Sequence, residues 1–168
     1  MRATLAIGVL VVGCGGNPGW ASDAAATPGS DDAVETEAIR LVLADWHEAA
    51  TAGDEKRYFS HLAPDAIFLG PDGKQRWNVD ALRAYAVPRY GEKGFPIESL
   101  RHHVLLSHDG RDAWLDEDLQ TQVLGPARGT GWMKRSDDGR WRIVRYSLVL
   151  TVPERRIGEV RRILAEDR

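Results

Sequence analysis

The pattern of apolar residues divides the chain into a helical part and a later part with a period of two. Residues 31–52 have helical spacing, and two aspartates precede the stripe while Gly53 follows it. The predicted buried stripe comprises Ile39, Val42, Leu43, Trp46 and Ala50. A second, short helix is expected over residues 54–62, because the residue before Pro64 is disfavoured in helical geometry.

A short strand and a third helix are expected next. Residues 66–69 are apolar and β-prone, and the Gly-Pro-Asp-Gly sequence at 70–73 is typical of a turn. Asn78 is a suitable N-cap for a helix in which Leu82, Tyr85 and Ala86 share a face. Gly91 and Gly94 are expected to end this helix.

The remaining sequence predicts an antiparallel sheet followed by one more helix. Four strands are expected over residues 97–108, 112–124, 129–135 and 140–152, with Asp-Gly hairpin signals at 109–110 and 138–139. Helices followed by antiparallel strands indicate the α+β class. After Pro153, a helix carries Ile157, Val160 and Leu164 on one side. We expect it to dock on its own domain rather than on a membrane, because acidic residues dilute its charge.

The first hairpin assigns opposite faces to neighbouring acidic residues. A two-residue turn at Asp109-Gly110 pairs His102 with Glu117 on an otherwise apolar face, and Leu100 with Leu119. Asp116 and Asp118 fall on the other face, where solvent or a subunit boundary would suit them. A carboxylate facing inward must be paired or raise its pKa. Glu117 and His102 are therefore candidate catalytic acid/base residues, with a buried pair that only sets the register as the alternative.

The second hairpin predicts two partly covered faces. One carries Thr130, Trp132, Lys134, Trp141, Ile143, Arg145 and Ser147, and the other carries Gly129, Gly131, Met133, Val144, Tyr146 and Leu148. The two strand glycines suggest a kink that would curve the sheet into a cup.

Composition limits the classes of function. With 168 residues, the chain suffices for one globular domain. A net charge of -3 provides no bulk attraction for nucleic acid or an anionic membrane. We find no phosphate-binding loop, dinucleotide fingerprint, hydrolase elbow or zinc-protease motif, and no cofactor is predicted. His47 and His61 lack a spaced carboxylate motif, so no metal site is predicted either.

The first residues have the features of an export signal. Residues 1–13 contain one Arg and a short apolar run, and Val11-Val12-Gly13-Cys14 resembles a bacterial lipobox. The resemblance implies lipid attachment at Cys14; a buried structural cysteine is the alternative. Residues 14–32 are a predicted flexible tether and residues 33–168 the domain. We therefore expect a lipid-anchored cell-envelope protein on the periplasmic side, in the outer membrane if the source is Gram-negative, because Gly15 replaces the retention aspartate.

The order of elements and several motifs over residues 45–153 resemble the SnoaL-like branch of the nuclear transport factor 2-like superfamily. The matching stretches include ADWHEAATAGDEKRYFSHLAPDAIFLGPDG, DGRDAWLDEDL and ARGTGWMKRSDDGRWRIVRYSL. The resemblance implies a cone in which helices pack in a bent antiparallel sheet around a pocket, often in a dimer through the outer sheet face. Members include cyclases, isomerases, dehydratases and binding or scaffold domains, so the fold carries over and the reaction does not.

These expectations lead to three functional hypotheses. The leading one is a pocket that binds a small, largely apolar molecule, with ligand-binding residues Trp46, Tyr58, Phe59, Trp77, Tyr85 and Trp132. The second is an acid/base enzyme of isomerase, cyclase or dehydratase type that uses Glu117 and His102. The third is a homodimeric scaffold with an unused pocket. For each aromatic residue, simple core packing is the competing interpretation.

Overall fold

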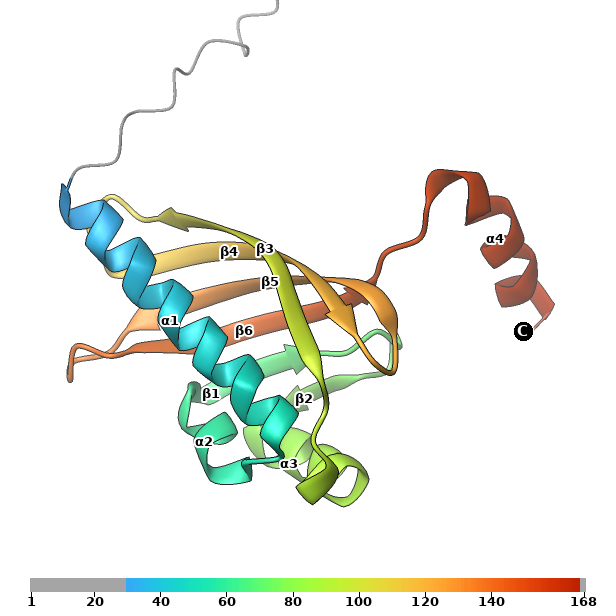
Figure 1. Ribbon diagram of the computed structural model, residues 1–168, viewed down its shortest axis with the longest axis horizontal. Coiled ribbons are helices and arrows are strands. Elements are labelled where there is room, and N and C mark those ends of the chain that lie inside the picture. Colours follow the sequence, from blue (N-terminus) through green and yellow to red (C-terminus); the bar gives the residue numbers. More distant parts are fainter. Residues whose placement is uncertain (1–29, 167–168) are drawn as a thin grey trace, which may run out of the picture.

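The computed structural model describes residues 30–166, in which a long helix lies across the concave face of a curved sheet (Figure 1). The helices are α1 (Ser30–Ala52), α2 (Glu55–Ser60), α3 (Val79–Tyr90) and α4 (Ile157–Glu166), with short 3₁₀ turns η1 (Gly91–Lys93) and η2 (Glu154–Arg156). The strands are β1 (Leu62–Leu69), β2 (Arg76–Asn78), β3 (Ile97–Leu106), β4 (Asp112–Thr121), β5 (Gly125–Arg135) and β6 (Trp141–Leu150). The predicted export signal and Cys14 lie outside the described residues.

The α+β class is confirmed, but the sheet is mixed rather than wholly antiparallel. Its six strands have the order β2-β1-β6-β5-β4-β3, and β1 runs parallel to β6. Strand β1 is longer than expected and includes Pro64, where the register with β6 shifts between Leu62 and Ile67. A proline cannot donate to a strand ladder and is tolerated at such an irregularity. Strand β2, which the sequence pattern did not predict, pairs antiparallel with β1.

Helix α1 confirms the predicted stripe and packs its apolar side on the sheet. On this helix, Ile39, Leu43 and Trp46 are buried, and they share the core with Met133 and Ile143 from the sheet. Ser30, Asp31 and Asp32 already belong to α1, so its first turn replaces the last three residues of the expected tether. Gly53 ends α1 with a positive φ of 67°, in a position where a Cβ atom would meet the Gly91 carbonyl oxygen at 2.2 Å. The close approach of α1 to η1 therefore requires glycine.

The first hairpin has the predicted register over most of its length. His102 lies opposite Glu117, and His103 lies opposite Asp116. An irregularity between Ser99 and Arg101 changes the register at the open end, so Ser99 rather than Leu100 lies opposite Leu119. The predicted Leu100–Leu119 pair is therefore wrong, because an inserted residue reverses the faces beyond it.

The second hairpin contains a similar irregularity. Trp132 pairs with Arg145 as expected, but the register then shifts and Met133 lies opposite Ile143. Trp141 and Ile143 consequently face inward, in the buried core with Met133, and not on the face of Trp132. The predicted grouping of Trp132 with Trp141 and Ile143 is wrong because the turn-based count assumed a regular ladder.

The last helix does not dock on the domain as predicted. Helix α4 projects away from the sheet (Figure 1), and among the described residues only η2 makes more than marginal contact with it. The apolar side chains of Ile157, Ile163 and Leu164 are exposed. Pro153 holds an extended conformation before η2, which directs the chain outward from the end of β6. None of the helices in residues 30–166 combines the length and apolar character that crossing a bilayer requires.

Candidate ligand pocket and the buried Glu117 cluster

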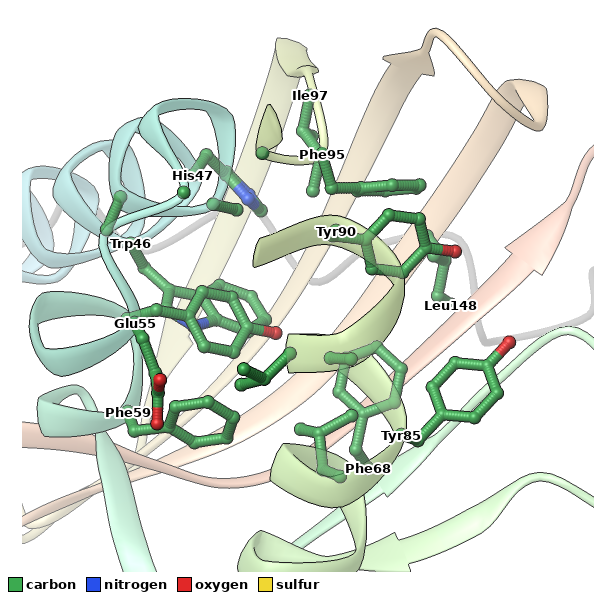
Figure 2. Close-up of a pocket in the computed structure, with 18 of the residues that line it drawn as sticks. Trp46, His47, Glu55, Phe59, Phe68, Tyr85, Tyr90, Phe95, Ile97 and Leu148 are labelled. Carbon is green, nitrogen blue, oxygen red and sulfur yellow. The ribbon is translucent and has the colours of Figure 1, made fainter. Parts of the chain in front are cut away.

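A cavity of about 330 Å³ lies between the helices and the concave face of the sheet. Side chains from α1, α2, α3 and the sheet converge on it (Figure 2). Nine aromatic residues line it: Trp46, Tyr58, Phe59, Phe68, Trp77, Tyr85, Tyr90, Phe95 and Tyr146. The volume is at the lower end of the range typical of small-molecule sites, and the lining is of the apolar kind that such sites use.

Ring contacts hold the aromatic wall in place. Trp46 stacks on Tyr58 with ring centroids 5.2 Å apart, and its ring meets the edge of Tyr146 at 4.7 Å. Trp77, on β2, packs against Tyr85, on α3, at 4.3 Å. Such contacts restrict the rotamers of large side chains, so the wall is largely preformed.

Five of the six residues expected to bind a ligand lie on this wall. They are Trp46, Tyr58, Phe59, Trp77 and Tyr85; a binding role for them stays a prediction. The placement of Trp132 was wrong. Its ring lies on the opposite face of the sheet, stacked on Trp114 at 6.0 Å, and its Nε1 donates to Asp112. Alternation along β5 turns Gly131 and Met133 inward, which leaves Trp132 facing outward.

Next to the cavity, Glu117 is completely buried and has three hydrogen-bond partners. His47 Nε2 lies 3.0 and 3.2 Å from its two carboxylate oxygens. The hydroxyls of Tyr146 and Ser99 donate to it at 2.9 and 3.2 Å. We call these four residues the Glu117 cluster. The inward orientation of Glu117 agrees with the strand pattern, and the cluster satisfies its charge without contact with solvent.

His102 is not the partner of Glu117. Although the two residues lie opposite each other in the ladder, the His102 ring accepts a hydrogen bond from Arg40 Nε on α1 and remains partly exposed. Desolvation, and then the charge of Arg40, lowers the pKa of His102. The expected Glu117–His102 pair is therefore wrong. Helix α1 packs over Glu117 and brings the His47 ring into hydrogen-bond contact with it. The His102 ring, on the neighbouring strand β3, bonds to Arg40 instead.

A family model for the SnoaL-like domain matches residues 39–153. The chain belongs to the SnoaL-like family. No curated protein matches it in sequence at a significant level.

Solved structures share this SnoaL-like fold at low sequence identity. A nuclear transport factor 2-like protein of unknown function from Pseudomonas putida KT2440 has a TM-score of 0.60 and 18% identity, covering 73% of this chain and 89% of its own. A candidate scytalone dehydratase from Novosphingobium aromaticivorans has a TM-score of 0.60 and 12% identity, covering 71% and 86%. A candidate ketosteroid isomerase from Parabacteroides distasonis has a TM-score of 0.55 and 18% identity, covering 68% and 86%. At these identities the similarity establishes the fold alone.

The protonation states in the Glu117 cluster follow from burial and hydrogen bonds. Burial by itself would raise the pKa of Glu117, but the hydrogen bonds from His47, Tyr146 and Ser99 outweigh it and lower the pKa below its usual value. A carboxylate only accepts hydrogen bonds, so His47 donates from Nε2. Burial, followed by the charge of Glu117, raises the pKa of Tyr146 well above its usual value, so this hydroxyl stays protonated and donates.

Two fully buried polar atoms of residues that line the pocket lack a partner within residues 30–166. They are Nε1 of Trp46 and Nδ1 of His47, neighbours on α1. The sequence placed His47 beside the predicted stripe but could not show which strand the helix covers. In the same described residues, no group of three His, Cys, Asp or Glu side chains is arranged to hold a metal ion.

The outer face of the SnoaL-like sheet is partly apolar. Leu105 is 70% exposed and Trp114 is 59% exposed. The charges expected on this face are present, since Arg101 Nε donates to Asp118 at 2.9 Å. Lys134 Nζ lies over the Trp132 ring, 4.8 Å from its centroid.

Proposed function

We propose that this SnoaL-like domain binds a small, largely apolar molecule in its pocket without transforming it. The aromatic cavity of about 330 Å³ carries this proposal. Burying an apolar ligand against such a wall is favourable by roughly 25 cal/mol for each Å² removed from water. The Glu117 carboxylate is already satisfied by three protein partners and does not border the cavity, which favours binding over chemistry.

A neutral fluorescent probe, N-phenyl-1-naphthylamine, tests the proposal by titration. Trp77→Ala removes a ring from the wall, and we expect it to weaken probe binding about tenfold or more, in line with the loss of a buried aromatic contact. Trp132→Ala is the matched control, because it removes the same side chain from outside the pocket. Probe binding that is absent, or equally weakened in both variants, would overturn the proposal.

The second candidate is an acid/base enzyme in which His47 replaces His102. The observation that favours it is that His47 borders the pocket while Glu117 orients its ring from behind, as carboxylates orient catalytic imidazoles. In this arrangement His47 would exchange protons through Nδ1, once a movement of the ring exposes this buried atom, and Glu117 would position the ring. Deuterium exchange next to the carbonyl of 2-decalone, followed by NMR in D₂O, tests the idea. Exchange above background that is lost in His47→Gln supports catalysis, and exchange at the background rate contradicts it.

We also propose that Cys14 carries a lipid that anchors the domain in the cell envelope, with the outer membrane as its place in a Gram-negative cell. The support is the lipobox-like sequence Val11-Val12-Gly13-Cys14. Metabolic labelling with a palmitate analogue in a bacterial host should label the wild type and not Cys14→Ser. Labelling of neither protein, with both recovered in the soluble fraction, would contradict the anchor.

A homodimer through the outer sheet face is a further proposal. Exposed Leu105 and the Trp114–Trp132 stack form an apolar area of the kind that a subunit interface covers. A purely scaffolding role would depend on this face and not on the pocket.

A further inference from the structure

Helix α4 is an amphipathic helix whose apolar side the domain leaves exposed. Ile157, Val160 and Leu164 are three and four residues apart, so they share one side of the helix. Ile157 is 53% exposed and Leu164 is 59% exposed, as is the neighbouring Ile163. Figure 1 shows α4 standing clear of the sheet and of the other helices. Its apolar side is therefore free to contact a partner outside the domain.

The charges of this segment differ in sign from those of the domain. Residues 153–166 contain four arginines and three glutamates, whereas acidic residues outnumber basic ones in residues 30–152. One of the glutamates, Glu159, is paired with Arg156 at 2.7 Å. Arg161 directly follows Val160 and flanks the apolar side. Its long stem allows the guanidinium to meet anionic groups at an interface while the apolar side chains enter it. The segment thus combines apolar and basic character.

The apolar side of α4 is too small to form a stable interface with another protein. A helix of 10 residues is about 15 Å long, so its apolar side covers on the order of 200 Å². A stable interface between two proteins buries about 800 Å² on each partner. A lipid bilayer sets no such minimum when a second attachment already holds the protein at its surface, and it accepts an amphipathic helix in its plane.

The predicted anchor would hold α4 near such a surface. The predicted tether runs from Cys14 to the start of α1 at Ser30, and a flexible chain of about 15 residues spans roughly 20 Å. In Figure 1, the first turn of α1 and helix α4 both lie away from α2 and α3. A bilayer that meets the domain on this side would face both the tether and α4. The pocket residues on α2 and α3 would then be turned away from the lipid.

We infer that α4 lies on the surface of an anionic lipid bilayer. Ile157, Val160 and Leu164 enter the boundary of the hydrocarbon region, and Arg161 contacts the lipid headgroups. The net charge of -3 on the whole chain has little influence on this helix, because salt screens charges more than about 8 Å away. This membrane contact is separate from the pocket and from lipid attachment at Cys14.

A fluorophore on α4 tests the inference in the full chain. Cys14 is the only cysteine, so a chain with Cys14→Ser and Leu164→Cys takes an NBD label at one position and cannot carry a lipid. Vesicles of phosphatidylglycerol and phosphatidylcholine in equal parts should shift the NBD emission to shorter wavelength, because the label enters an apolar environment. Gly158→Cys, also with Cys14→Ser, is the matched control. A Cβ atom at Gly158 has no atom within 4 Å, and this position faces away from Val160, so its label should keep the emission seen in water.

Titration of the Leu164→Cys label with vesicles measures the contribution of charge. Arg161→Gln should weaken partition onto the anionic vesicles about fivefold, the effect of one basic residue near such a surface. It should leave the weaker partition onto phosphatidylcholine alone unchanged. Arg128→Gln is the control, because it removes one positive charge from β5 instead of α4. It should leave both partition constants unchanged.

Several results would overturn the inference. They are an emission at position 164 that vesicles do not shift, equal shifts at positions 158 and 164, and equal partition onto anionic and phosphatidylcholine vesicles. An emission at position 164 that is already that of an apolar environment without vesicles would also overturn it, because the domain or a second copy would then cover α4. The label reports on α4 in chains that lack Cys14, so failure here leaves ligand binding and lipid attachment standing.

Discussion

His47 Nε2 lies 3.0 Å from Glu117 Oε2, across a separation of 70 residues in the chain. This contact joins α1 to strand β4 at the edge of the pocket. Both side chains are buried, His47 with 4% and Glu117 with 0% of its surface exposed. The pair therefore supports the part of the pocket wall that Trp46 and Tyr58 form.

Removing His47 should destabilise the domain strongly. In His47→Ala, the buried Glu117 loses its main hydrogen-bond partner, and removing one partner of a buried pair costs about 3 kcal/mol or more. Urea denaturation measures the change in the free energy of unfolding. His102→Ala is the control, with an expected cost below about 1 kcal/mol because its ring is partly exposed. A larger cost for His102→Ala than for His47→Ala would restore His102 as the partner.

The contribution of Glu117 to stability should disappear in acid. The pKa of Glu117 is lower in the folded state than its usual value of 4.5. A lowered pKa stabilises the fold above the unfolded-state pKa, and this stabilisation is lost as the pH falls through the folded-state pKa. The difference in free energy of unfolding between wild type and Glu117→Gln should thus be constant from pH 7 to about pH 5.5 and shrink below about pH 4.5. A difference that widens in acid would show that the folded-state pKa is raised.

Gly129→Ala should disturb the cluster through steric overlap. A Cβ atom at Gly129 would lie 1.8 Å from the Tyr146 hydroxyl oxygen, which donates to Glu117. We expect a loss of about 2–3 kcal/mol, typical of overpacking a filled core. Thermal unfolding measures it, and Gly73→Ala is the matched control because a Cβ there has no atom within 4 Å. Equal melting temperatures for the two variants would contradict the packing described for Tyr146.

Trp114→Glu should separate the subunits if the outer sheet face joins two copies. A charge in the centre of an apolar interface lacks a partner and opposes association. Light scattering coupled to size-exclusion chromatography should give a dimer for the wild type and a monomer for Trp114→Glu. Leu164→Glu, on exposed α4, should remain dimeric. A monomeric wild type at high concentration would contradict the dimer.

Deleting residues 154–168 should leave the stability of the domain unchanged. Helix α4 has only marginal contact with the core in the described residues, so its removal should change the free energy of unfolding by less than about 0.5 kcal/mol. Urea denaturation of both chains measures this. A loss of several kcal/mol would mean that α4 docks on the domain in solution.

Local patterns by themselves determined much of this protein. Alternation placed Glu117 inward, the Asp-Gly turn paired it with His102 in the ladder, and the helical stripe identified Ile39, Leu43 and Trp46 as core. These features depend on residues close together in the chain, where periodicity and turn geometry are decisive. The resemblance of short motifs over residues 45–153 supplied the family.

Only the tertiary structure decided which group meets Glu117. A period of two specifies the face of a side chain and not its partner. The sequence therefore predicts His102 as the partner of Glu117, whereas the path of α1 brings His47 to it. The sequence also did not predict the irregularities after Ser99 and Trp132 or the parallel pairing of β1 with β6. Each of these features depends on contacts between segments far apart in the chain. Local periodicity gives no information on the free energy of such contacts. The pocket itself arises from the same packing of α1 against a curved sheet.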